Sequence, residues 1–141
     1  MNILLFLSLI LIIFLYLYIS KKVKYGQIQQ IFLVDLIFLF VLCCSVFLQS
    51  ILSKKLNINP IFFEYFSYIG GCFLPVSIFF TGLIFANTKI KFKKLYLLFF
   101  IIPICSLLIL WTNNIHLLFY ISYSVNIYDT IFGPYFNIHC I

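Results

Sequence analysis

Four long apolar runs account for most of this chain and constrain its fold more than any other feature. They cover residues 2–19, 31–52, 61–86 and 95–111, and each has 17 or more residues. At about 1.5 Å rise per residue, a helix of this length crosses a hydrocarbon core of roughly 30 Å. The sequence therefore predicts an all-α fold, a polytopic transmembrane helix bundle with four spans.

The composition excludes a soluble globular domain. Hydrophobic residues make up 65% of the chain and charged residues 9%, whereas soluble domains are near half apolar and a quarter charged. The net charge of +6 comes from lysines that flank the apolar runs, where each contributes about 1 kcal/mol of attraction to anionic headgroups. We therefore expect one domain, residues 1–141, with the lipid bilayer as partner and no nucleic acid.

The lysines are distributed unevenly between the connections. Three lie between residues 20 and 30, two between 53 and 60, four between 87 and 94, and none from 112 onward. Alternate connections share a side of the membrane, and the positive-inside rule places the lysine-rich side in the cytoplasm. This predicts a multi-pass protein of the cell membrane with its N-terminus out and an outer loop over 112–134. The first run lacks the flanks of a cleavable signal peptide.

Helix boundaries follow from Gly and Pro. Gly26 marks a turn, the second helix is expected to end near Ser53, and residues 57–60 form a turn before Pro60. Pro103 falls midway through the fourth run. A fifth helix begins at about residue 135, but only seven residues follow Pro134, about a third of a span. We interpret the chain as a truncated or split piece of a longer protein.

The acids and cysteines of the runs offer little chemistry. Asp35 is the one charged residue embedded in a run, about one turn from its start, and pairing with a cytoplasmic lysine is favoured over a proton relay. Glu64 falls in the first turn of the third helix, where a carboxylate stabilises the helix dipole. The five cysteines show no ligand spacing and are interpreted as small hydrophobes.

The outer loop, 112–135, concentrates the polar residues of the chain. His116, Asp129 and His139 match no known metal-ligand spacing, so no metal site is predicted. Two interpretations stay open: an aromatic, amide-rich surface for a small apolar ligand, and a loop that covers the end of the bundle. The sequence contains no Walker loop, GxSxG, HExxH or paired carboxylates. We therefore expect no enzyme activity and no cofactor.

Three motifs, taken in order, resemble a known family. Each is weak alone, and the similarity as a whole covers the four predicted spans and the start of the fifth, essentially the whole chain. They are Tyr68-Ile69-Gly70 with Phe73-Leu74-Pro75 and Phe79, then Trp111-Thr112-Asn113 with His116-Leu117-Leu118-Phe119-Tyr120, then Gly133-Pro134-Tyr135-Phe136 with His139. In this order the chain resembles the N-terminal seven-transmembrane sensor region of bacterial histidine kinases, here about four and a half helices long.

The resemblance implies a signal-input module with an outward N-terminus, which passes a signal to cytoplasmic catalytic domains. It also implies a homodimer, since kinases of this class are typically dimeric. The family often has a second histidine where this chain has Leu117, which weakens the case for a histidine pair. Helices 5–7 and the kinase core are not among these residues, so this piece is expected to phosphorylate nothing.

The motif residues have architectural roles in this interpretation. Thr112 and Asn113 can cap the outer end of the fourth helix through side-chain-to-backbone hydrogen bonds, and His116 can bond to the loop or to the third helix. Together with His139 they are the candidates for sensing an extracellular or membrane-borne small ligand. In the third helix, Gly70 and Gly71 permit close helix contact, and Pro75 introduces a bend suited to a switch.

Two other classes remain as alternatives. One is a small integral-membrane subunit of a larger complex, such as an organelle-encoded respiratory component from an AT-rich genome. The absence of arginine beside nine lysines is typical of such a genome. The other is half of a transporter, which would need inverted repeats or acids at the bilayer midplane. Neither feature is seen in the sequence.

Overall fold

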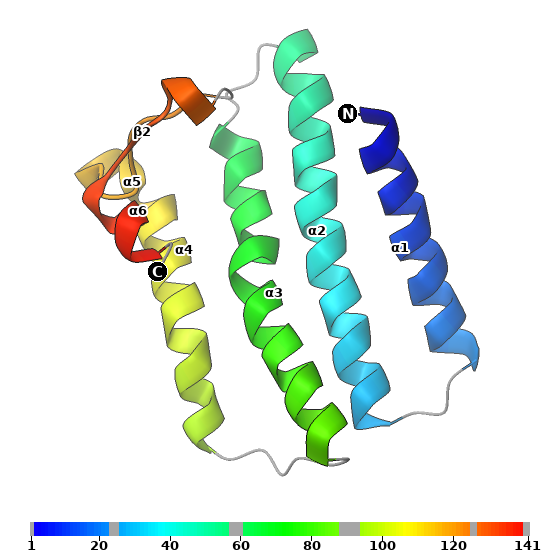
Figure 1. The fold of residues 1–141 in the computed structure, drawn as a ribbon. Helices are drawn as coiled ribbons and strands as arrows, with labels where there is room; N and C mark the ends of the chain where they lie inside the picture. Colours follow the sequence, from blue (N-terminus) through cyan, green and yellow to red (C-terminus); the bar gives the residue numbers. More distant parts are fainter. Residues whose placement is uncertain (1, 23–25, 57–60, 88–93, 125–126, 140–141) are drawn as a thin grey trace.

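Four long helices stand side by side in the order of the chain in this computed structural model (Figure 1). The structure describes residues 2–22, 26–56, 61–87, 94–124 and 127–139, and for residues 2, 53–56, 87, 127 and 139 the backbone alone. Within these residues, four helices are long and apolar enough to cross a membrane. The expectation of an all-α transmembrane bundle is confirmed.

The first three helices are longer than their apolar runs. They are α1 (Asn2–Lys22), α2 (Gln27–Leu56) and α3 (Ile61–Asn87). The second helix was expected to end near Ser53 and continues to Leu56, because polar residues at a helix end are tolerated where the chain leaves the bilayer. The predicted turn at 57–60 lies outside the described residues.

The turn predicted at Gly26 is the start of α2. The Gly26 carbonyl accepts a hydrogen bond from the Gln30 N–H at 3.1 Å, as the first bond of a helix does. The buried side chain of Gln29 donates from Nε2 to the carbonyl of Ile19 at 2.9 Å. This bond satisfies one of the carbonyls left free at the end of α1 and joins the two helices.

The fourth span differs from the predicted helix in its first part. It begins as a 3-10 helix, η1 (Lys94–Phe100), and becomes α-helical only in α4 (Ile101–Trp111). Pro103 thus lies in the first turn of an α-helix rather than midway through one. In that turn a backbone N–H has no intrahelical partner, so a proline costs least there.

The helices α2 and α3 approach each other closely at Gly70. A Cβ added to Gly70 would lie 2.5 Å from the carbonyl oxygen of Phe38, whereas one added to Gly71 would meet only the Leu42 side chain, at 3.8 Å. Only glycine therefore fits at residue 70. Phe38 and Phe73 stack nearby with ring centroids 5.5 Å apart. The helix α3 continues unbroken through Pro75.

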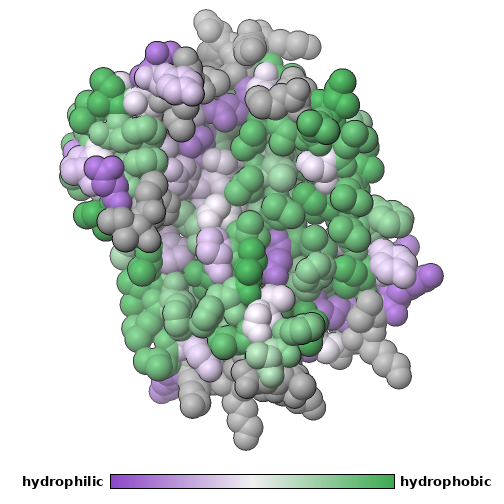
Figure 2. Space-filling view, in the orientation of Figure 1, coloured by the Kyte–Doolittle hydropathy of each residue, from purple (hydrophilic) through white to green (hydrophobic). Residues whose placement is uncertain are grey.

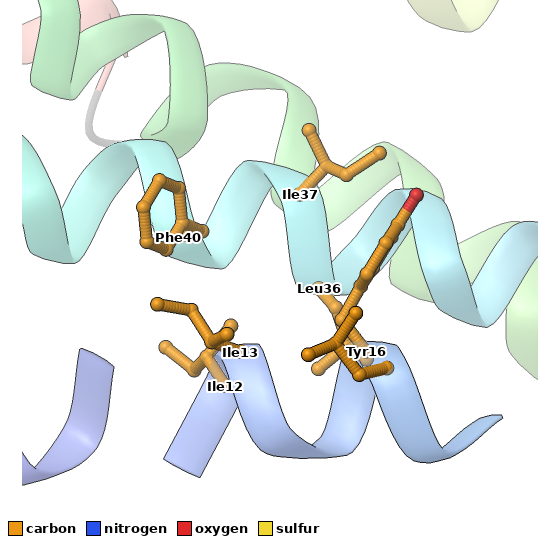
Figure 3. Close-up of a pocket in the computed structure, with 7 residues that line it drawn as sticks. Ile12, Ile13, Tyr16, Leu36, Ile37 and Phe40 are labelled. Atoms are coloured by element: carbon orange, nitrogen blue, oxygen red, sulfur yellow. The ribbon is translucent and has the colours of Figure 1, made fainter. Parts of the chain in front are cut away.

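The outer faces of the helices are apolar. Figure 2 shows hydrophobic residues over most of the visible flanks of the bundle. Between α1 and α2 runs a groove in which Ile12, Ile13 and Tyr16 face α2 (Figure 3). Leu36, Ile37 and Phe40 form the other wall. In a membrane protein such faces contact lipid chains, so the exposed apolar surface is the expected one.

The chain after α4 folds against one end of the bundle, and we call residues 113–139 the cap. It comprises α5 (Asn113–His116), β1 (Tyr120–Ser122), η2 (Ile127–Asp129), β2 (Ile131–Phe132) and α6 (Pro134–His139). The two strands pair antiparallel, with Tyr120 opposite Phe132 and Ser122 opposite Ile131. The cap lies at the same end of the bundle as the N-terminus (Figure 1).

Candidate functional site

Asn113 organises the cap from its centre. Its side chain is buried, and Nδ2 donates to the carbonyl of Tyr120 at 2.7 Å. Its Oδ1 accepts from the N–H groups of Phe119 and Tyr120, at 2.8 and 3.0 Å. One amide thus makes three hydrogen bonds to buried backbone groups. Asn113 joins the end of α4 to the start of β1.

Thr112 and His116 form a hydrogen-bonded chain back to α4. The Leu118 N–H donates to Nδ1 of His116 at 3.1 Å, so a neutral ring carries its proton on Nε2. Nε2 lies 3.0 Å from Oγ1 of Thr112, which donates to the Leu108 carbonyl at 2.6 Å. Both hydrogen bonds of His116 are therefore local to the loop, and neither reaches α3.

Gly133 brings the second half of the cap onto the first. Its N–H donates to the carbonyl of Phe119 at 2.8 Å, and the Tyr135 N–H donates to that of Leu118 at 2.9 Å. A Cβ added to Gly133 would collide with the backbone carbonyl of Leu118. This approach follows a left-handed turn at Leu117, whose φ is 52°. The Gly-Pro motif is thus explained by backbone packing.

Aromatic rings form the core between the cap and the bundle. Leu110, Phe119 and Tyr120 are its buried centre. The Phe119 ring meets Tyr68 of α3 edge-on with centroids 5.1 Å apart, and meets Phe136 edge-on at 5.7 Å. Such edge-to-face pairs are each worth about 0.5–1.5 kcal/mol beyond their buried area. This core holds the cap firmly against α3 and α4.

Glu64 is the centre of a polar network beside that core. Its Oε1 accepts from the Tyr120 hydroxyl at 3.2 Å, and its Oε2 from the Tyr123 hydroxyl at 3.0 Å. Gln49 of α2 donates to the Tyr123 oxygen at 2.6 Å. The Tyr120 oxygen lies 3.2 Å from the Tyr68 hydroxyl and, having one hydrogen, can donate to Glu64 while accepting from Tyr68. The network joins α2, α3 and the cap.

The network surrounds a small pocket, which we call the Glu64 pocket. Its cavity volume is about 230 Å³. It is lined by Gln49, Glu64, Tyr68, Tyr120, Tyr123, Ser124, Thr130, Phe132 and Phe136. Burial, followed by interactions with neighbours that include the Glu64 carboxylate, raises the pKa of the Tyr120 and Tyr123 hydroxyls. Both phenols are therefore neutral hydrogen-bond donors at physiological pH.

The sequence missed this pocket. Glu64 was interpreted only as a partner of the helix dipole, and Tyr68 and Tyr120 only as residues of the family motifs. The topology could have indicated this pocket, because alternate connections of an antiparallel bundle lie at the same end. The start of the third helix and the outer loop had to meet there. Which side chains would meet depends on the strand register, which hydropathy does not specify.

As far as they are described, the sensing and metal-ligand candidates taken from the sequence do not line this pocket. Among the described residues, no three His, Cys, Asp or Glu side chains cluster as metal ligands do. Asp129 is exposed in η2. The backbone of His139 belongs to α6, and its side chain lies outside the description. Thr112, Asn113 and His116 lie together, but as supports of the cap and not as pocket walls.

Asp35 has a partner that the sequence did not predict. The helix α2, which contains Asp35, begins at Gln27, so Asp35 lies about two turns from the start of the helix rather than one. Asp35 is 9% exposed, and its Oδ2 accepts from the Thr81 hydroxyl of α3 at 2.6 Å. Its Oδ1 is buried with no partner among the described residues. The lysines at 24, 89, 91 and 93 lie outside those residues, so a pairing with one of them stays a prediction.

Comparison with known proteins identifies the family. A family model described as the N-terminal 7TM region of histidine kinase matches residues 3–141. No curated protein and no solved structure gives a match. The region that this model describes is a sensor part of histidine kinases and is not itself catalytic. The three motifs, the apolar helices and this match agree, and the chain belongs to the family of N-terminal seven-transmembrane regions of histidine kinases.

Proposed function

We propose that this chain is the membrane-embedded signal-input module of a histidine kinase in the cell membrane. In this proposal the module passes its signal to a kinase core. The stimulus is a small ligand, extracellular or membrane-borne, that meets the cap. In this proposal the chain forms a homodimer, because histidine kinases of this class typically act as dimers.

One observation carries the proposal beyond family membership. The cap is joined by side-chain hydrogen bonds to α2 at Gln49 and to α3 at Glu64. A ligand that displaced any of these bonds would change how the two helices are held together. Coupling between sites requires that a ligand favour one arrangement of such an element over another. The hydrogen bonds of the cap to α2 and α3 therefore support a role for the cap in passing a signal into the bundle.

The proposed orientation places the N-terminus and the cap outside the cell. Support comes from the lysine count of the connections, seven on one side and two on the other. Lys21 and Lys22 end α1 at the end of the bundle opposite the cap (Figure 1). The lysine-rich end would then face the anionic lipids of the inner leaflet.

Cysteine labelling tests the orientation. In a variant without the native cysteines, Ile115→Cys places a thiol at a cap residue that is 85% exposed. A membrane-impermeant maleimide added to intact cells should label it, and should label Lys21→Cys only after the membrane is opened. The reverse pattern would contradict an outward cap and remove the proposed receptor surface.

Signalling tests the role of the cap. In the histidine kinase that carries this chain, Asn113→Ala and His116→Ala should blunt the change in autophosphorylation that the stimulus causes. Membrane insertion should be unaffected. Asn114→Ala is the matched control, because Asn114 is exposed beside Asn113. An unchanged response in both cap variants would show that the cap has no part in signalling.

Purification in mild detergent separates this proposal from a subunit role. A sensor module should elute as a dimer with its kinase. Recovery in a large assembly of fixed stoichiometry would instead favour a small subunit of a membrane complex.

A further inference from the structure

The Glu64 pocket combines one carboxylate with several aromatic rings. Tyr120 has ring centroids 5.2 Å from Tyr123, 5.8 Å from Phe132 and 6.1 Å from Phe136. Phe132 and Phe136 stack with their centroids 4.0 Å apart. Apart from Tyr120, these walls are partly exposed, so the pocket is accessible from outside. Rings gathered around one acid are the chemistry that recognises an organic cation.

The charge of the pocket is not balanced within the described residues. The described part of the chain shows no cationic side chain bonded to Glu64, whose two oxygens accept from tyrosine hydroxyls. An ionised carboxylate offers about four lone-pair sites, so further donors can still bind. The raised pKa values of Tyr120 and Tyr123 keep both phenols uncharged. With Glu64 ionised, the described residues of the pocket carry a single negative charge.

We infer that the Glu64 pocket binds an organic ammonium group. Glu64 supplies the counter-charge, and the faces of the surrounding rings supply cation–π attraction. The cavity of about 230 Å³ is below the usual range for drug-sized ligands, so it accommodates a small alkylammonium. The inference rests on the proposed function in naming the class of ligand for the cap. It replaces the small apolar ligand offered by one of the two open interpretations of the outer loop, because the carboxylate belongs to the pocket.

Two sources of this group fit the site. The ammonium can belong to a free amine or to the headgroup of a phospholipid, since the cap lies where the helices leave the apolar layer. The rings of Tyr68 and Phe136 are shared between the pocket and the cap core. An occupant therefore contacts the same side chains that hold the cap in place.

Binding of choline to the purified full chain in detergent tests the free ligand. Ligand-observed NMR titration should show choline binding at least about tenfold more tightly than 3,3-dimethyl-1-butanol, its neutral isostere. Glu64→Gln keeps a side chain that can accept a hydrogen bond but removes the charge, and should weaken choline binding by about tenfold. Asp129→Asn removes an exposed acid of the same cap and should leave binding unchanged.

A second variant keeps the test decisive if Glu64→Gln does not fold. Phe132→Leu retains an apolar side chain in the pocket wall but removes an aromatic face. It should weaken binding of choline several-fold and leave the neutral isostere unaffected. Equal binding of choline and the isostere, or no effect of either variant, would overturn the inference for a free amine.

Bilayers of two compositions test the lipid source. The chain is placed in nanodiscs that contain phosphatidylethanolamine with phosphatidylglycerol, or phosphatidylglycerol alone. Native mass spectrometry should then show phosphatidylethanolamine retained by the wild type and by Asp129→Asn, and lost from Glu64→Gln. If neither arm depends on Glu64, the ammonium site does not exist. Binding without any signalling response would overturn the proposed function and leave the site intact.

Discussion

The cap and the groove between α1 and α2 are held together in different ways. In the cap, Asn113 alone makes three hydrogen bonds to the backbone, and Phe119 is fully buried. In the groove, Ile13 remains 46% exposed and Ile37 45%. The hydrophobic effect drives burial of the apolar core of the cap. It does not drive α1 against α2, because lipid chains are as apolar as the helices that they surround. The cap is thus specified by particular contacts, and α1 by its length and hydropathy.

The largest expected effect comes from Gly133→Ala in the cap. The new methyl group collides with the backbone of Leu118, and we expect a loss of about 3 kcal/mol of cap stability. Gly82→Ala is the control, because nothing lies within 4 Å of the added Cβ, and it should be neutral or slightly stabilising. Near-UV circular dichroism during thermal unfolding measures both. Equal melting curves would contradict the close backbone contact at Gly133.

Asn113→Ala should have the next largest effect. It leaves two N–H groups and one carbonyl of Phe119 and Tyr120 without their partner, and the expected cost is about 2 kcal/mol. Asn114→Ala, on the exposed face of the same turn, should cost less than about 0.5 kcal/mol. Hydrogen exchange at the Phe119 and Tyr120 amides reports the change directly. Protection retained at both amides would contradict the role given to Asn113.

The smallest effect is expected from Ile13→Ala in the groove. A lipid chain can fill the space that the side chain leaves, so the loss should stay below about 0.5 kcal/mol. Unfolding by added denaturing detergent, measured in the same mixed micelles as for Asn113→Ala, gives the comparison. A loss as large as that of Asn113→Ala would mean that α1 is held by specific packing after all.

The same contrast explains what the sequence could predict. The order of the helices, the bundle and the bonds of Thr112 and Asn113 to the nearby backbone follow from local patterns. The 3-10 start of the fourth span does not, because its apolar residues suit either kind of helix. The bond from Tyr120 to Glu64 joins residues 56 apart in the chain. No local pattern carries that information, and the pairing of Asp35 with Thr81, 46 residues away, was missed for the same reason.

The backbone contact at Gly70 gives α3 a fulcrum. Glu64 lies roughly 9 Å along the helix on one side of this contact, and Thr81 roughly 17 Å along it on the other. Any tilt of α3 about Gly70 swings the two ends in opposite directions, and the longer arm moves further. A small displacement of Glu64 beside the tyrosines would therefore produce a larger displacement of Thr81, which contacts Asp35 on the other side of Gly70.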